Sequence, residues 1–403
     1  MVRVRNNIRD LSTPLRAFGK SCNERREEEK CTKRIRRMML MLVRGQGGQN
    51  QQVPLIIVYY LMRKRSRIQF APSLSRTDEV AHFDISIGDI SRELCWSLFR
   101  FRKVHLTRVF NELEVPEVMI LSNRCKMQGE HVFLFFLARF QFPDKLFHME
   151  RHWGRDFTIL SRAIQTMVGF IAENHFHLLK DNLDFFVSRF HVYNTKIKAK
   201  TMALHGAVPL ELRDTAAFWD ATCHRVSRPR RNQKNLYNGA KKFHCYKTGS
   251  LYLPDGMHGY VPDLVPGRWN DNKQRSSCGI IVSLSQLLAN AGQRYVVVTD
   301  KGYGNVLGFW AMYHGRTALT NRQEDVNRKI SSVRVSIEWG FGDIYQTWGF
   351  IGCYRLQKSL LNPVGDYFHA ATLMTNVRTC LYGNQTSDFF DCQPPTLEEY
   401  FAQ

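Results

Sequence analysis

Four β-branched residues in a row, Val296-Val297-Val298-Thr299, run directly into the acid Asp300. Such a run favours a β-strand, and the glycines of the following Lys301-Gly302-Tyr303-Gly304 are typical of a turn. In an open α/β sheet, functional groups gather just outside the carboxyl ends of the strands. The run therefore predicts a strand that places Asp300 at a functional edge of a sheet.

Two further acids stand in settings that differ from each other. The segment Ala216-Ala217-Phe218-Trp219-Asp220 predicts a second, shorter strand that ends on an acid. The segment from Val326 to Trp348 predicts an amphipathic helix that carries Glu338. Its apolar residues recur at spacings of three and four: Ile330, Val333, Ile337, Phe341, Ile344 and Trp348.

Three carboxylates from two strands and one helix suit the hydrolysis or transfer of a phosphodiester. This reaction needs positive charge that neutralises the transition state and activates a water or a 3′ hydroxyl. Mg²⁺ or Mn²⁺, held by a few carboxylate oxygens, provides that charge, and a pair of such ions about 3.5–4 Å apart can hold both reacting oxygens. We therefore predict Asp220, Asp300 and Glu338 as the catalytic residues and the metal ligands.

Short motifs follow one another around these acids: Asp220-Ala221-Thr222 with Arg228-Pro229, Tyr237-Asn238-Gly239-Ala240-Lys241-Lys242-Phe243-His244, Pro254-Asp255-Gly256, Pro266-Gly267 with Asn270-Asp271, Thr299-Asp300-Lys301-Gly302-Tyr303, and Asn327, Ser331, Arg334, Phe341 and Gly342 around Glu338. In these motifs and their order, the chain resembles PIF/Harbinger-type transposases and domesticated Harbinger-derived nucleases, which are DDE superfamily endonucleases. The resemblance covers roughly residues 127–350. The chain departs from the family at Ala221, where a glycine is common, at Lys301, and after Phe350.

The resemblance implies an α/β fold in which the catalytic domain is RNase H-like, with a mixed sheet flanked by helices. It also implies an enzyme that cuts DNA at transposon ends and joins the 3′ hydroxyl to a target, often with a separate Myb-like DNA-binding protein. A domesticated derivative that binds DNA or a protein without cutting is the alternative. A nuclease acting on RNA or hybrids is a third interpretation. The sequence leaves open whether the chain acts as a homo-oligomer.

The charge balance favours nucleic acid as the partner. The formal net charge is +21, and basic chains bind polyphosphates through electrostatics that do not depend on base sequence. A basic cluster without any acid follows Asp220 in the sequence, although a solvated surface is the simpler interpretation for any single lysine. Its predicted DNA-binding residues are Arg228, Arg230, Arg231, Lys234, Lys241 and Lys242, flanked by Arg225 and Lys247.

Composition divides the chain into four regions. We predict a basic, largely disordered tail at 1–90, a helical region at 91–200, the catalytic domain at 201–360 and a C-terminal extension at 361–403. In the tail, basic runs at 33–37 and 63–67 are nuclear-import signals or DNA anchors, and the chain is expected in the nucleus. The apolar run at 53–62 is too short to cross a bilayer, so we expect no membrane span.

The helical region resembles a helix-turn-helix DNA-binding block. Apolar patterning predicts helices from Glu130 to Phe140, Asp144 to His152 and Thr158 to about His175. Three short helices with tight turns are typical of that motif, while a bundle that only packs on the catalytic domain is the alternative. Candidate contacts to phosphate or bases are Arg151, Arg155 and Arg162, and Phe133, Phe135 and Phe136 are expected in the core in either case.

Three residues are candidates for a supporting role at the acids. Asp271 either orients a metal ligand or caps a helix, with the cap slightly favoured. Arg334 lies four residues before Glu338 and is expected to pair with that carboxylate or with phosphate. His244 would contact DNA or assist proton transfer, with a buried, hydrogen-bonded histidine as the simpler alternative.

The ten cysteines show no paired framework, which favours a reduced, intracellular protein. Cys223-His224 and His244-Cys245 contain the ligand types that zinc prefers. Neither pair has the usual spacing of two residues between cysteines, so zinc is a weak alternative.

Overall fold

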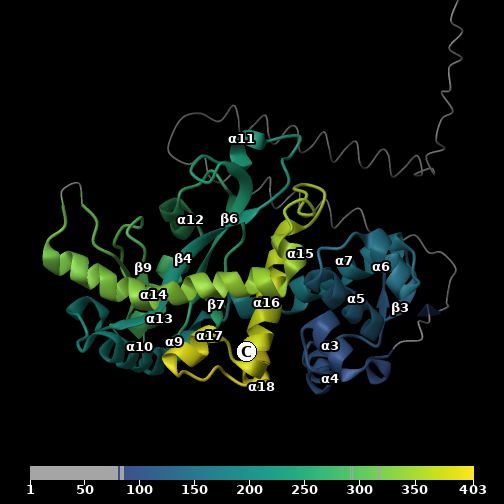
Figure 1. Cartoon of the computed structure of the whole chain (residues 1–403), viewed down its shortest axis with the longest axis horizontal. Helices are drawn as coiled ribbons and strands as arrows, with labels where there is room; N and C mark the ends of the chain where they lie inside the picture. The colour runs from purple at the N-terminus through teal and green to yellow at the C-terminus, as the bar shows by residue number, and fades with distance from the viewer. Residues whose placement is uncertain (1–79, 82–85, 291, 293, 316–317) are drawn as a thin grey trace, which may run out of the picture. The chain divides into compact units, whose positions relative to one another are not determined.

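A mixed β-sheet carries the first two of the three acids (Figure 1). The computed structural model describes residues 80–81, 86–290, 292, 294–315 and 318–403. The tail motifs at 33–37, 53–62 and 63–67 lie outside these described residues. Within the described residues, no helix is long and apolar enough to cross a membrane.

The sheet has the strand order β10-β9-β4-β6, and β6 also pairs with three short strands. β10, β9 and β4 are parallel to one another, whereas β6 is antiparallel to β4. The strands are β4 (Thr215–Arg225), β5 (Tyr237–Asn238), β6 (Phe243–Tyr252), β7 (His258–Tyr260), β8 (Val265–Pro266), β9 (Val296–Thr299) and β10 (Phe309–Ala311).

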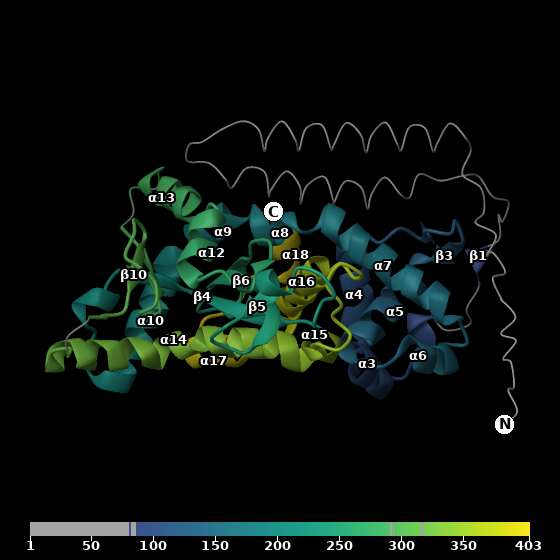
Figure 2. The ribbon, with the colours of Figure 1, turned by 90° about the horizontal axis from the view of Figure 1, so that it is seen from above.

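Helices cover both faces of this sheet. Figure 2 shows β4 and β6 between α14 (Asn321–Thr347) on one side and α12 (Asp271–Ser277) on the other. Side chains of β4 alternate accordingly, because successive residues of a strand point to opposite faces. The Phe218 ring stacks on Phe390, whose helix α17 packs on α14, while the next residue, Trp219, lies over Gln274 of α12 on the other face.

Local sequence explains why α14 forms where it does. Thr320 and Gln323 make a reciprocal capping box at its start, in which the Thr320 hydroxyl accepts from the Gln323 backbone N–H. The apolar residues spaced by three and four that predicted this helix are buried against the sheet and its neighbours, as predicted. Gly340 lets the helix approach the ring of Tyr252 on β6, since a Cβ there would lie 2.4 Å from that ring.

The helical region contains the three predicted helices, with bounds that differ by a few residues: α5 (Gly129–Gln141), α6 (Leu146–Trp153) and α7 (Phe157–Asn174). α5 is buried along almost its entire length, and Phe133, Phe135 and Phe136 are core residues as expected. A helix buried in this way cannot enter a DNA groove. The helix-turn-helix interpretation therefore depends on α6 and α7 and stays a prediction.

The C-terminal residues pack on the remainder of the domain. The described residues from 80 to 403 belong to one compact unit, and α16 (Val364–Tyr382) contacts both α14 and α7. The Asn376 side chain of α16 accepts from the backbone N–H of His258 and donates to its carbonyl. The boundaries that the sequence suggested at 200 and 360 stay predictions, because the segments on either side of them share this unit.

Shorter elements complete the described part of the chain: β1 (Val80–Ala81), α3 (Arg92–Phe99), α4 (Lys103–Glu112), β2 (Val118–Ile120), β3 (Lys126–Gln128), α8 (His177–Lys180), α9 (Leu183–Ser188), α10 (Phe190–His205), α11 (Gln233–Leu236), α13 (Ile280–Asn290), α15 (Gly349–Gly352), α17 (Gln385–Phe390) and α18 (Leu397–Phe401). β1, β3 and β2 form a second, three-stranded sheet. α10 packs on both β4 and α14.

A buried histidine links β6, β7 and α14 and makes the fold sensitive to acid. The His258 imidazole lies 2.9 Å from the Ser250 hydroxyl and 3.4 Å from the Gly340 carbonyl, and burial lowers its pKa to about 4. An unfolded chain protonates histidine near pH 6.5. Because the unfolded state takes up this proton first, the stability held above pH 6.5 is lost as the pH falls towards 4.

We expect His258 to contribute roughly 3 kcal/mol to this loss of stability. His258→Gln, which does not titrate, should weaken the dependence of the unfolding free energy on pH between 6.5 and 4, and the buried His224, whose pKa is also lowered to about 4, should account for part of what is left. Urea unfolding at several pH values measures this, with the exposed His191→Gln as the control. An unchanged pH dependence in His258→Gln would contradict the expectation.

Candidate active site

The pairing of two parallel strands brings Asp220 and Asp300 together. Trp219 of β4 is in register with Thr299 of β9, so the residues that follow them, Asp220 and Asp300, are neighbours across the sheet. β9 ends at Thr299 as predicted. The prediction for Asp220 was wrong in one respect: β4 continues five residues beyond it, to Arg225, so this acid lies in the middle of a strand.

The reason for the longer strand is pairing with β6. Residues 218–225 of β4 form a continuous antiparallel ladder with β6, in which Asp220 is opposite Ser250 and Arg225 is opposite Cys245. Backbone hydrogen bonds to a neighbouring strand extend β4 through a segment whose side chains are mostly polar. The apolar run alone therefore gave too short a strand.

α14 brings the third acid and an arginine to the same place. The Arg334 guanidinium donates to Asp220, with 2.8 Å between Nη1 and Oδ2. Its Nη2 lies 3.6 Å from Oδ1 of Asp300 and 3.9 Å from Oε1 of Glu338. The sequence pointed to the pair with Glu338, but the shortest contact of Arg334 is with Asp220. The structure thus brings all three predicted acids around one guanidinium.

The three carboxylates differ in their exposure and in how tightly they are held. The side chains of Asp220, Asp300 and Glu338 are 22%, 39% and 63% exposed, whereas that of Arg334 is 11% exposed. Burial raises the pKa of Asp220 and the nearby Asp300 carboxylate adds to this, while Arg334 acts in the opposite direction. Asp220 is the fixed member of the set, and Glu338 faces solvent most freely.

The donor set suits a hard divalent cation, since it consists of carboxylate oxygens that already surround a positive group. The three carboxylates are, however, spaced too widely to bind one ion as they stand. Within the described part of the chain, no three Asp, Glu, His or Cys side chains are grouped closely enough to hold a metal ion. The acids gather around Arg334 and not around a common point between them.

Residues of α12 fix the loop that follows Asp300. The Asn272 side chain donates to the Gly302 carbonyl at 3.0 Å and accepts from the Gly304 N–H at 2.9 Å. Arg275, which is buried, donates to the Gly304 carbonyl at 2.8 Å. Sequence reasoning missed both supporting residues, although their position just after the Asn270-Asp271 motif was a usable signal.

Asp271 does not cap α12. Asn270 is the N-cap, because its side chain accepts from the Lys273 backbone N–H at 2.7 Å, and Asp271 is the first helical residue. The Asp271 carboxylate instead accepts from the buried Lys247 ammonium at 2.7 Å. This ion pair ties α12 to β6, on the face of the sheet opposite α14.

His244 does not lie beside the acids. It pairs with Tyr237 of β5 near the start of β6, six residues before Ser250, which corresponds to about 20 Å along the strand. The half-buried ring packs against the Tyr237 ring, and partial burial together with Arg228 lowers its pKa. Proton transfer at the acids by His244 is therefore not supported by its position.

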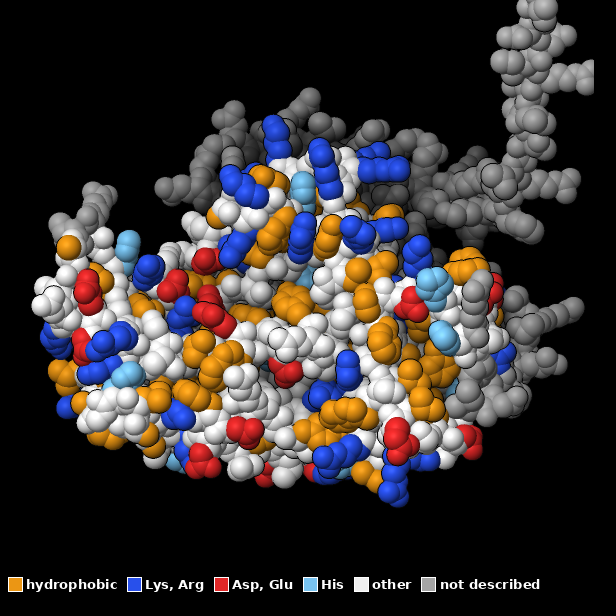
Figure 3. Space-filling model, in the orientation of Figure 1, with side chains coloured by type: hydrophobic (Ala, Val, Ile, Leu, Met, Phe, Trp, Pro, Cys, Tyr) orange, Lys and Arg blue, Asp and Glu red, His pale blue; other side chains and the backbone are white. Residues whose placement is uncertain are grey.

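The segment 225–247 carries the predicted DNA-binding cluster, and we name it the basic arm. It consists of the last residue of β4, the connection to β6 and the first half of β6. Figure 3 shows Lys and Arg side chains gathered over α11 and the adjoining end of β6. Arg225 stacks on Tyr354 with 4.0 Å between the guanidinium carbon and the ring centre. Six predicted contacts on the arm are exposed: Arg228, Arg230, Arg231, Lys234, Lys241 and Lys242.

The other predicted DNA contacts lie in the helical region. Arg155 and Arg162 are half-buried, at the turn before α7 and within it. The side chain of Arg151 in α6 is outside the described side chains.

The two cysteine-histidine pairs do not converge. Cys223 and Cys245 share a hydrogen bond between their thiols, which lowers the pKa of Cys223 to about 7. His224 lies on the opposite face of β4, where its ring stacks on Tyr345, and His244 packs on Tyr237. The arrangement gives zinc no common point among these four residues.

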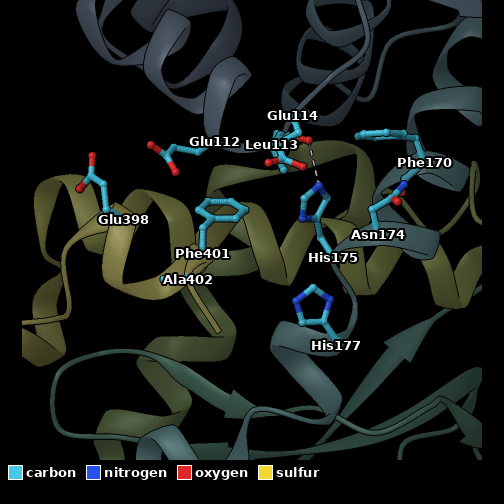
Figure 4. Close-up of a pocket in the computed structure, with 10 residues that line it drawn as sticks. All are labelled: Glu112, Leu113, Glu114, Phe170, Asn174, His175, His177, Glu398, Phe401 and Ala402. Atoms are coloured by element: carbon cyan, nitrogen blue, oxygen red, sulfur yellow. Dashed lines mark hydrogen bonds between the residues drawn. The ribbon is translucent and has the colours of Figure 1, made fainter.

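Two recesses help to place the chemistry. One has a volume of about 400 Å³ and is bordered by Glu112, His175 and Glu398, which are far in sequence from the acids (Figure 4). His175 is hydrogen-bonded there to the Leu113 carbonyl at 2.9 Å. Another of about 350 Å³ runs along α14 from Glu338 to Gln346. Only the second adjoins a predicted catalytic residue.

Two parallel strands and one helix gather two aspartates and a glutamate, which is compatible with the class of enzymes that act on phosphodiesters. Comparison with protein families supports this class: residues 219–376 match the DDE superfamily endonuclease model. This part of the chain is a DDE superfamily endonuclease domain, and it includes all three acids. No curated protein and no solved structure matches the chain.

Proposed function

We propose that the chain is a metal-dependent DNA endonuclease of PIF/Harbinger transposase type, which cuts and joins phosphodiester bonds at transposon ends. The observation that carries this proposal is the convergence of Asp220, Asp300 and Glu338 within 4 Å of one guanidinium, inside a DDE endonuclease domain. The mixed sheet, with parallel strands β4 and β9 bearing the aspartates, supports an RNase H-like fold.

Each acid has a distinct role in this proposal. Asp220 and Asp300 would be the ligands held in place by strands paired in register, and Glu338 would add a more exposed carboxylate from α14. Bound Mg²⁺ or Mn²⁺ would neutralise the charge that develops on the phosphate and activate the attacking water or 3′ hydroxyl. Asn272 and Arg275 act as positioning residues for the loop behind Asp300.

In this proposal the basic arm binds double-stranded DNA. Its lysines and arginines are exposed and have no acid near them in the sequence, and side chains of this kind neutralise backbone phosphates. The arm continues directly from β4, so one strand links the proposed DNA-binding residues to Asp220. We include nuclear localisation, a Myb-like partner and homo-oligomeric assembly in the proposal on the family resemblance alone.

A non-catalytic, domesticated derivative is the second candidate, and one observation favours it. The acids as they stand are held by Arg334 and are not grouped as a metal site within the described residues. A derivative of this kind would retain the basic arm and bind DNA or a protein without cutting.

Cleavage of duplex DNA bearing the terminal repeats, with Mg²⁺ or Mn²⁺ and any Myb-like partner, separates the two candidates. We expect the wild-type chain to cut and Asp300→Asn to lose about a hundredfold or more in rate while binding DNA equally well. Equal binding without cleavage by either protein would support the non-catalytic derivative. RNA and hybrid duplexes in the same assay test the third interpretation.

A further inference from the structure

One positive side chain occupies the centre of the acidic site. Arg334 forms ion pairs with all three acids, and its side chain is the least exposed of the four. It projects from α14 one turn before Glu338, and the burial of Val333 and Ile337 beside it holds that part of the helix against the core. A guanidinium with five N–H donors can serve several carboxylates at once.

Both oxygens of Asp220 are already engaged. Oδ1 accepts from the backbone N–H of Ala221 at 2.8 Å, and Oδ2 accepts from Arg334 at 2.8 Å. The contacts of Arg334 with Asp300 and Glu338, at 3.6 and 3.9 Å, are too long for hydrogen bonds. The arginine therefore holds one acid firmly and draws the other two towards it only by charge.

We propose that Arg334 is a resident counter-ion, which keeps the three acids together without metal and competes with a divalent cation for Asp220. This inference rests on the proposed function and adds a regulation of the same site. Arg334 must release Oδ2 of Asp220 before that carboxylate can turn fully to a cation. A backbone phosphate offers the released guanidinium an equivalent partner, because arginine binds phosphate oxygens in the same forked geometry as carboxylates.

The competition predicts that the protein without DNA holds metal weakly. Arg334 repels a cation placed among the acids, and it occupies an oxygen that the cation needs. Removing the positive charge should therefore tighten metal binding, although it also removes a contact within the folded protein. A residue that only positioned the acids would give the opposite sign, since its loss would let the ligands separate.

Mn²⁺ binding to the full chain, followed by electron paramagnetic resonance without DNA, tests the proposal. We expect Arg334→Met to bind Mn²⁺ about tenfold or more tightly than the wild type, from the loss of one nearby unit charge. Arg328→Met is the matched control, because Arg328 is on the same helix but pairs with Asp325, and it should leave Mn²⁺ affinity unchanged. Adding Asp300→Asn to Arg334→Met should abolish the gain, which assigns the bound ion to the acids.

Equal or weaker Mn²⁺ binding by Arg334→Met would overturn the proposal. The proposed function would survive that result if wild-type cleavage still depended on Asp300, and it would fail separately if the wild type did not cut. If Arg334→Met does not fold, Arg334→Gln tests the charge alone, because glutamine is neutral but can still donate to Asp220. It should bind Mn²⁺ more tightly than the wild type but less tightly than a variant that also frees Oδ2, and equal or weaker binding would again overturn the proposal.

Discussion

Replacing Glu338 by glutamine is expected to lower the cleavage rate by about 10²–10³-fold, the range measured when one group that stabilises a transition state is removed. The stability of the folded protein should hardly change. The Glu338 side chain is 63% exposed and meets Arg334 only at 3.9 Å, so we expect the unfolding free energy to change by less than about 0.5 kcal/mol. Activity and stability thus separate at this residue.

Single-turnover cleavage and urea unfolding of the same preparations measure both quantities. Glu324→Gln is the matched control, since Glu324 is an exposed glutamate in the first turn of the same helix. It should leave cleavage unchanged and lower the unfolding free energy by at most about 1 kcal/mol, because a first-turn carboxylate stabilises the helix N-terminus. Cleavage by Glu338→Gln within about threefold of the wild type would remove Glu338 from the catalytic set.

Two glycines of α14 are expected to respond to alanine with opposite signs. At Gly340 a Cβ would lie 2.4 Å from the ring of Tyr252, which is buried and donates its hydroxyl to Thr386 at 3.1 Å. Overpacking of this kind usually costs about 1–3 kcal/mol. At Gly342 the nearest atom is 3.9 Å away, on the flexible Gln346 side chain, so alanine fits there and adds up to about 1 kcal/mol of helix stability.

Chemical unfolding of the two variants gives the comparison directly. Gly340→Ala should unfold at a lower urea concentration than the wild type and Gly342→Ala at a higher one. Because Gly340 is two residues from Glu338, displacement of α14 should also slow cleavage in that variant. If both variants were equally stable, the close approach of α14 to β6 would be refuted.

Elements formed by local patterns could be predicted from the sequence. α14 was recognised from apolar residues at helical spacing, and β9 from its β-branched run, because both signals lie within the segment itself. The grouping of Asp220 with Asp300 followed from their positions on strands, yet no local signal gave the register of β4 against β9.

Features that depend on residues distant in the chain could not be predicted from the sequence. The length of β4 depends on its ladder with β6, and the preference of Arg334 for Asp220 over its helical neighbour Glu338 depends on how α14 lies on the sheet. The ion pair of Asp271 with Lys247 is of the same kind, since a strand and a helix meet there. Spacing along one helix could suggest only the pair of Arg334 with Glu338.

The continuation of β4 beyond Asp220 fixes the distance between the acids and the start of the basic arm. Arg225, where the basic arm begins, is five positions after Asp220, which corresponds to about 17 Å along a strand. One turn of duplex DNA, about 10 base pairs, spans about 34–36 Å. A duplex that follows β4 from Arg225 to the acids would therefore be cut about half a helical turn, or roughly five base pairs, from a phosphate bound near Arg225. The length of β4 would in this way set the distance between that contact and the cut.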